Sequence, residues 1–156
     1  MAKRYKLLSW NVNGLRAVAR RGDFVPVFEQ HKPDVLCLQE TKAELVQLPA
    51  EVVNYDAYNA DFNWSQVKKG YSGVATYSKE KVPVVAKGLG EPRYDGEGRV
   101  LVSGFENFTL FNVYFPNGKA SPERLDFKMA FYRDFLRLLE RYRKDGRKDL
   151  VICGDV

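Results

Sequence analysis

Short apolar runs recur along the chain, and several of them end in a polar residue. The clearest extends from Val35 to Leu38 and is followed directly by Gln39 and Glu40. Runs of this length, bounded by polar or turn-forming residues, predict buried strands. The same reasoning predicts strands at residues 5–12, 73–79, 82–87, 99–102, 107–115 and 149–155, and extended, aromatic-rich chain at 55–64. A glycine-rich, acidic loop is expected at 88–98, before the strand at 99–102.

A helical period is clearest after residue 121. Apolar side chains there recur every three or four residues, at Phe127, Phe131, Phe135, Leu138 and Tyr142, which predicts one buried helix face. The order Ser121-Pro122-Glu123 is typical of a helix start, and Gly146 of a helix end. Shorter helices are expected at 24–31, capped by Asp23, and near 47–53, with a basic loop or short helix at 15–21. Strands joined by helices in some places and loops in others predict a mixed sheet with helices on its outer face.

Length and composition place the chain among ordinary globular proteins. Its 156 residues suffice for one domain, and 45% are hydrophobic and 29% charged. The net charge of +5 favours an anionic partner, although solubility explains it equally well. Cys37 and Cys153 lie in apolar strands, which favours two reduced, buried thiols over a disulfide. No signal peptide or membrane-length apolar segment is visible, so we expect a cytoplasmic protein (nucleoid-associated in a prokaryote) that is not secreted and has no membrane partner.

Polar side chains that suit phosphate chemistry stand where the predicted strands end. Asn11, Glu40 and Asp155 each lie at such an end, and Tyr114 ends a fourth strand with Asn117 just beyond. Strands of layered α/β proteins place ligands at their carboxyl ends. Oxygen ligands with one or two carboxylates suit Mg²⁺, while a second acid can orient a water and hydroxyl or amide groups can donate to a phosphate. If these strand ends converge, their side chains together suit phosphodiester hydrolysis.

Several of these residues also have simpler explanations. A glutamate at a strand end commonly pairs with a nearby lysine, here Lys42, or with solvent. Asn13 is explained by the Asn13-Gly14 turn signal. His31, the single histidine of the chain, is expected to be exposed at a helix end. The glycines at 70 and 73 do not form a nucleotide-binding fingerprint, although this loop could let Tyr71 approach a phosphate.

Six sequence blocks occur in an order that resembles a known family. They are Ser9-Trp10-Asn11-Val12-Asn13-Gly14-Leu15-Arg16-Ala17, Leu38-Gln39-Glu40-Thr41-Lys42, Gly70-Tyr71-Ser72-Gly73-Val74, Gly98-Arg99-Val100, Asn112-Val113-Tyr114-Phe115-Pro116-Asn117-Gly118 and Cys153-Gly154-Asp155. In this order they resemble the exonuclease III-type apurinic/apyrimidinic endonucleases of the endonuclease/exonuclease/phosphatase superfamily. The resemblance implies an α/β fold, part of a four-layer α/β/β/α sandwich of the DNase I-like kind.

The resemblance also implies a role for each matched residue. Glu40 would be the main Mg²⁺ ligand, with Asn11 beside it, and Mn²⁺ could substitute for Mg²⁺. Tyr114 would contact the scissile phosphate, Asp155 would activate or position the attacking water, and Asn117 would hold a phosphate oxygen. Contacts to the DNA are implied for Asn13, Lys42, Tyr71, Arg99 and Arg124.

The chain departs from the family pattern at its end. The family follows the Asp155 strand with an asparagine two places on, and later with an acid and a Ser-Asp-His block, none of which is present here. His31 cannot replace that histidine. The resemblance therefore implies that residues 1–156 are a single incomplete domain, truncated after the Asp155 strand, with the second sheet largely missing. An uncovered apolar strand would then bind the missing C-terminal half of the domain or a second copy of the chain.

The implied function is that of a Mg²⁺-dependent DNA repair nuclease. It would hydrolyse the phosphodiester 5′ to abasic sites in double-stranded DNA, with 3′–5′ exonuclease or 3′-end trimming activity, although this chain alone is expected to lack useful turnover. One alternative is a non-catalytic DNA-binding or complementing fragment. A lesser alternative is another phosphodiesterase or phosphatase of the same superfamily.

Overall fold

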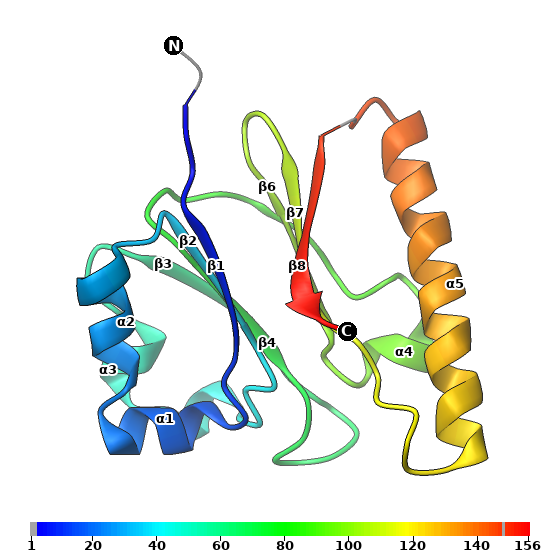
Figure 1. Ribbon diagram of the computed structural model, residues 1–156, viewed down its shortest axis with the longest axis horizontal. Coiled ribbons are helices and arrows are strands. Elements are labelled where there is room, and N and C mark those ends of the chain that lie inside the picture. The colour runs from blue at the N-terminus through cyan, green and yellow to red at the C-terminus, as the bar shows by residue number, and fades with distance from the viewer. Residues whose placement is uncertain (1–2, 148) are drawn as a thin grey trace.

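Two four-stranded sheets face each other at the centre of the protein (Figure 1). The computed structural model describes residues 3–147 and 149–156. The first sheet has the order β1-β2-β4-β3 and the second the order β5-β6-β7-β8. Their strands are β1 (Leu7–Asn11), β2 (Val35–Gln39), β3 (Asn59–Asn63), β4 (Val74–Ser78), β5 (Val84–Lys87), β6 (Val100–Gly104), β7 (Thr109–Tyr114) and β8 (Leu150–Asp155). The pairs β1–β2 and β7–β8 are parallel, and the other pairs are antiparallel.

Helices cover the outer face of each sheet (Figure 1). Beside the first sheet lie α1 (Leu15–Arg21), α2 (Phe24–His31), α3 (Ala50–Val53) and the 3₁₀ helix η1 (Leu45–Gln47); beside the second lie α4 (Pro92–Asp95) and the long α5 (Pro122–Lys144). Each sheet forms a separate hydrophobic cluster with its own helices. A third, smaller cluster between the sheets contains Val35, Cys37, Phe105 and Leu110. This arrangement confirms the predicted α/β/β/α layers.

The second sheet is more complete than the sequence analysis expected. Four of its strands are present, because the strands after residue 80 pair with one another instead of extending the first sheet. The loop expected at residues 88–98 also contains a helical turn, α4. The chain therefore supplies both inner layers of the sandwich.

Strand β8 differs from the buried strand that its sequence predicts. Ile152 is 46% exposed, and none of the six residues of β8 is fully buried. The physical reason is its position, because β8 ends the sheet order and pairs with β7 alone among the described strands. All of β2, by contrast, is buried between β1 and β4. Cys37 and Cys153 are free thiols, as predicted, but Cys153 is only partly buried because it lies on β8.

The predicted helices are largely confirmed. Helix α5 begins as expected, with the Ser121 Oγ accepting a hydrogen bond from the backbone N–H of Arg124 at 3.1 Å. Helix α2 has the predicted bounds, but the Asp23 side chain does not cap it, because its carboxylate pairs with Arg21 at 2.8 Å. None of the helices in the described part of the chain is long and apolar enough to cross a membrane.

A buried polar link joins the two sheets. The Gln39 Nε2 donates to the Asn112 Oδ1 at 2.9 Å, and the Asn112 Nδ2 donates to the Ala75 carbonyl oxygen at 2.8 Å and the Thr76 Oγ1 at 3.1 Å. Gln39 and Asn112 are 1% and 0% exposed. Satisfied polar networks in a low-dielectric interior fix the relative positions of their members. Since Gln39 immediately precedes Glu40, this link sets where the end of β2 stands against the second sheet.

Candidate active site

The ends of four strands from both sheets meet at one edge of the sandwich. Asn11 at the end of β1 is paired in register with Gln39, so Glu40 follows directly at the same edge. Tyr114 at the end of β7 is paired in register with Asp155 at the end of β8. Because each of these pairs is parallel, its two strands end on the same side of their sheet. The predicted convergence of strand ends is thus present in the fold.

Asn11 connects the two predicted acids across the gap between the sheets. Its Nδ2 donates to the Glu40 Oε2 at 2.9 Å and to the Asp155 Oδ2 at 2.7 Å. A side-chain amide has two N–H groups, so one serves each carboxylate. The Asn11 Oδ1 in turn accepts from the backbone N–H of Asn13 at 2.9 Å, which fixes the orientation of the amide. We call Asn11, Glu40 and Asp155 the carboxylate cluster.

Lys42 and Asn13 lie on the other side of Glu40. The Lys42 Nζ is 3.1 Å from the Glu40 Oε1 and donates to the Asn13 Oδ1 at 2.7 Å. Burial would raise the pKa of Glu40, but hydrogen bonds from Asn11 and Lys42 outweigh it, so the pKa of this carboxyl is lowered. Glu40 is therefore ionised at neutral pH.

The loops that carry the cluster have an unusual backbone. Asn13, Glu40, Lys42 and Ser72 have φ angles of 45°, 57°, 53° and 55°, a left-handed conformation that is uncommon outside glycine. These loops bind each other, since the backbone N–H of Gly14 donates to the Glu40 carbonyl at 2.8 Å and that of Lys42 to the Ser72 carbonyl at 2.8 Å. Strained backbone of this kind concentrates at functional sites.

Tyr114, Asn117 and Asp155 line a small hollow of about 160 Å³ together with Lys119 and Lys128. Burial and the charge of Glu40 raise the pKa of Tyr114 to about 12, so its hydroxyl keeps its proton and can donate it. The Asn117 Oδ1 accepts from the backbone N–H of Lys119 at 2.8 Å, which orients the Asn117 side chain. The structure thus brings together all three residues that were predicted to be catalytic.

A second group of charged residues lies next to Tyr114. The Tyr71 oxygen accepts hydrogen bonds from the Arg99 Nη2 at 2.8 Å and the Arg124 Nη2 at 3.1 Å, and both arginines also bind the Glu97 carboxylate. Arg99 is only 3% exposed, and its guanidinium carbon lies 4.9 Å from the centre of the Tyr114 ring. Because Arg99 is buried, it is better placed to support Tyr71 and Tyr114 than to contact a phosphate directly. We call Tyr71, Glu97, Arg99 and Arg124 the arginine cluster.

Glu97 was missed by sequence reasoning, which assigned it to a glycine-rich loop. The available signal was the Glu97-Gly98-Arg99 triplet, in which two opposite charges flank a glycine. Gly98 has φ +64°, and a Cβ there would lie 2.3 Å from the Trp64 carbonyl carbon. Only glycine combines this conformation with so close an approach of two backbones. Glu97 and Arg99 can therefore turn toward the same cluster.

The carboxylate cluster fits a hydrated magnesium ion. Within residues 3–147 and 149–156 there is no group of three or more His, Cys, Asp and Glu side chains that could hold a metal. The Glu40 and Asp155 carboxylates offer hard oxygen atoms only, while the Asn11 amide faces them with its Nδ2 and binds the Asn13 N–H with its Oδ1. Mg²⁺ keeps several waters and needs no more than one or two carboxylates, so the donor set present is sufficient for it.

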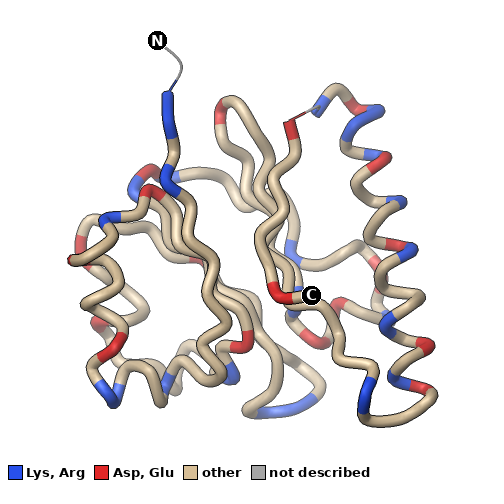
Figure 2. Tube along the Cα trace, in the orientation of Figure 1, with Lys and Arg blue, Asp and Glu red and all other residues tan. Residues whose placement is uncertain are grey.

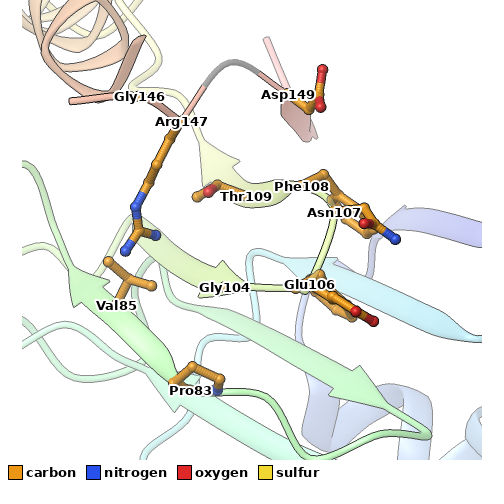
Figure 3. A pocket seen from close by; sticks show the side chains of 11 residues that line it. Pro83, Val85, Gly104, Glu106, Asn107, Phe108, Thr109, Gly146, Arg147 and Asp149 are labelled. Carbon is orange, nitrogen blue, oxygen red and sulfur yellow. The ribbon is translucent and has the colours of Figure 1, made fainter. Parts of the chain in front are cut away.

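A larger pocket of about 510 Å³ lies at the opposite end of the second sheet, where β7 and β8 begin (Figure 3). It is lined by the β6–β7 turn, including Glu106 and Asn107, and by Arg147 and Asp149 from the connection between α5 and β8. None of the catalytic, metal-binding or DNA-binding residues predicted from the sequence lines it. The hollow at the candidate site is smaller and is lined by charged and polar side chains, which suits a polyanion better than a small apolar ligand.

Residues 8–156 match the profile of the Endonuclease/Exonuclease/phosphatase family. The chain belongs to this family. Among curated members, an exodeoxyribonuclease of Bacillus subtilis (strain 168) is 40% identical over 151 residues, which are 97% of this chain and 58% of that protein. The DNA repair nuclease APEX1 of Danio rerio is 40% identical over 157 residues, 99% of this chain and 49% of that protein. The chain thus spans about half the length of the curated relatives it matches.

Solved structures of family members share the fold. A 3′-5′ exonuclease from Neisseria meningitidis superposes with a TM-score of 0.81 at 26% identity, over 96% of this chain and 57% of that one. An AP endonuclease from Archaeoglobus fulgidus gives a TM-score of 0.80 at 28% identity, over 97% and 57%. The family resemblance drawn from the six sequence blocks is confirmed.

Proposed function

We propose that the chain carries part of the catalytic domain of a Mg²⁺-dependent DNA repair nuclease. This nuclease hydrolyses the phosphodiester 5′ to abasic sites in double-stranded DNA and also has 3′–5′ exonuclease or 3′-end trimming activity. The observation that supports the proposal most directly is the Asn11 amide, which binds Glu40 and Asp155 from opposite sheets at one edge. The names of the relatives agree with it, because they include an exodeoxyribonuclease, a DNA repair nuclease and an AP endonuclease.

In this proposal the carboxylate cluster prepares the attacking water. Glu40 would be the main Mg²⁺ ligand, with Asn11 beside it, and Mn²⁺ could substitute; the ion would supply Lewis-acid stabilisation of the charge that develops on the phosphate. Asp155 accepts a proton from the water or orients it. Tyr114 and Asn117 donate hydrogen bonds to phosphate oxygens, and the raised pKa of Tyr114 keeps its donor proton in place.

The arginine cluster and neighbouring loops bind the DNA backbone. Tyr71 and Arg124 contact a phosphate, Arg99 supports them from behind, and Lys42 and Asn13 contact the strand beside Glu40. Figure 2 shows further Lys and Arg residues on the loops along the lower edge of the molecule. Contacts of this kind give an affinity that falls with salt and depends little on sequence.

A second candidate function is DNA binding or complementation without turnover by this chain alone. One observation favours it: among the residues that the structure describes, the site offers two carboxylates, Glu40 and Asp155, and no group of three metal-binding side chains. The half-exposed strand β8, with Ile152 on its surface, would then bind the rest of such a domain or a second copy of the chain.

One experiment separates the two candidates. The chain alone is compared with a chimera in which the part of Bacillus subtilis exodeoxyribonuclease beyond the matched region follows Val156. On a labelled duplex with one abasic-site analogue, we expect binding but no useful cleavage by the chain, and cleavage by the chimera in Mg²⁺ but not in EDTA. The Asp155→Asn chimera is the matched control and should be inactive. Persistent cleavage in EDTA, or a folded chimera without activity, would contradict the nuclease proposal.

A further inference from the structure

Glu97 is the centre of the arginine cluster. Its Oε1 accepts from the Arg124 Nη1 at 2.8 Å, and its Oε2 accepts from the Arg99 Nε at 2.6 Å and the Arg124 Nη2 at 3.2 Å. The Glu97 side chain is 12% exposed. Burial would raise the pKa of Glu97, but hydrogen bonds from Arg124 and Arg99 lower it, so the carboxylate is ionised. One carboxylate thus orients both guanidinium groups.

The two arginines determine the direction of the Tyr71 hydroxyl proton. A phenol oxygen has two acceptor positions and one proton. Both acceptor positions are taken by the Nη2 atoms of Arg99 and Arg124, at 2.8 and 3.1 Å. The proton must therefore point away from the arginines, and in this structure it is directed at the Glu97 Oε2 at 3.5 Å.

That last contact is the weakest of the set. A distance of 3.5 Å is at the limit of a hydrogen bond, and the Glu97 Oε2 already accepts two shorter bonds from the arginines. An oxygen with two lone pairs cannot bind a third donor well. The Tyr71 proton is consequently available to a better acceptor that approaches from solvent.

We propose that Glu97 is a positioning residue, which holds Arg99 and Arg124 around the Tyr71 oxygen so that the Tyr71 proton is donated to a DNA backbone phosphate. Its carboxylate also cancels one of the two guanidinium charges, which leaves the cluster with one net positive charge for one phosphate. This inference rests on the proposed function, because the phosphate is that of DNA. It assigns a role to a residue that contacts no substrate itself.

The test is a double-mutant cycle between Glu97→Gln and Tyr71→Phe in the 156-residue chain. Binding of a labelled intact duplex is followed by fluorescence anisotropy in EDTA at low salt. In the unsubstituted background, Tyr71→Phe should weaken binding about tenfold, since it removes a charge-assisted hydrogen bond. In the Glu97→Gln background the same change should cost less than about twofold, because the arginines no longer aim the hydroxyl. Glu97→Gln alone should also steepen the salt dependence, since it uncovers a positive charge.

Glu91→Gln is the charge-matched control, because Glu91 is exposed in the same loop and lies outside the cluster. A spectroscopic readout accompanies it: the buried Arg99 Nε–H should give a slowly exchanging, downfield signal in ¹⁵N-resolved NMR spectra of the unsubstituted chain and of Glu91→Gln, but not of Glu97→Gln. If Glu97→Gln fails to fold, Arg124→Gln removes one donor to Tyr71 and should shrink the Tyr71→Phe penalty in the same way.

The outcomes distinguish this inference from the function on which it rests. Equal Tyr71→Phe penalties in both backgrounds, or rapid exchange of the Arg99 Nε–H in the unsubstituted chain, would overturn the positioning role and leave DNA binding intact. Failure of the unsubstituted chain to bind any duplex would overturn the proposed DNA binding, and with it the role of Glu97.

Discussion

The carboxylate cluster and the arginine cluster have similar arrangements but opposite charges. Each holds two like charges close together through one bridging side chain: Asn11 bridges two acids, and Glu97 bridges two arginines. The bridges differ in charge. The neutral Asn11 amide removes no charge from the two acids, although Lys42 pairs with Glu40 from the other side, whereas the Glu97 carboxylate removes one of two positive charges. The comparison agrees with the proposal that the first cluster binds a divalent ion and the second a single phosphate.

The two clusters are also anchored differently. Asn11 and Asp155 are the last residues of strands from different sheets, and Glu40 follows β2 with a left-handed backbone. The arginine cluster draws its members from loops and from the first turn of α5. The carboxylate cluster therefore depends on how the two sheets pack, and the arginine cluster depends mainly on its own ion pairs.

The largest expected effect is at Glu40. In the chimera, Glu40→Gln should lower kcat about 10³-fold or more, because loss of the proposed charged metal ligand removes several kcal/mol of transition-state stabilisation. Duplex binding by the chain in EDTA should change less than about threefold. Glu51→Gln, at an exposed position of α3, should leave both unchanged. An equal loss of DNA binding and of turnover would show that the two clusters do not have separate tasks.

A smaller effect is expected from the link between the sheets. Asn112→Leu should lower the free energy of unfolding of the chain by about 2–4 kcal/mol, because it removes one of the acceptors of the buried Gln39 amide and the donor to the Ala75 carbonyl and the Thr76 hydroxyl. Urea denaturation measures this change, with the exposed Asn54→Leu as control. The positional consequence is equally testable: Asn112→Leu should perturb the NMR signal of the Asn11 side-chain amide more than that of the Arg99 Nε–H. The reverse order would contradict the different anchoring of the clusters.

The smallest effect concerns pH. The pKa of Glu97 is lowered from its ordinary value of 4.5, so its ionised form stabilises the fold above that pH, and this contribution is lost as the pH falls through the lower folded pKa. The unsubstituted chain should therefore lose stability below pH 4.5. Glu97→Gln, which cannot titrate, should lose less over the same interval, while Glu91→Gln should follow the unsubstituted chain. Urea denaturation midpoints of the unsubstituted chain and of both variants, measured at a series of pH values, test this prediction.

Much of the site could be predicted from the sequence, because local patterns determine where strands end. Glu40 follows an apolar run, and Asp155 ends another. Parallel pairing places Glu40 beside Asn11 in one sheet and Asp155 beside Tyr114 in the other, and the packing of the two sheets then brings these pairs to one edge. The pairing of the later strands into a second four-stranded sheet could not be foreseen from the apolar runs. Strand partners are chosen by long-range packing, which an apolar run does not specify.

The missed residues are those whose partners are distant in the chain. Gln39 reads as the polar end of a strand, and its buried bond to Asn112 spans 73 residues. Glu97 reads as part of a loop, although its partner Arg124 lies on α5. The sequence did contain a signal for the bond between Gln39 and Asn112. Each is a single amide in an otherwise apolar strand, β2 or β7, and a buried amide needs a hydrogen-bond partner. This signal identifies the need for a hydrogen bond but not the residue that meets it.

Gly98 has a consequence for how this chain can vary. Any side chain there would collide with the backbone at Trp64, at a φ of +64° that most residues rarely adopt. Any substitution of Gly98 should therefore abolish the arginine cluster and duplex binding instead of weakening them by degrees. The backbone would have to move away from the first sheet and would carry Glu97 and Arg99 with it. Random mutagenesis followed by selection for duplex binding should recover glycine at residue 98 and a mixture of residues at exposed Glu91.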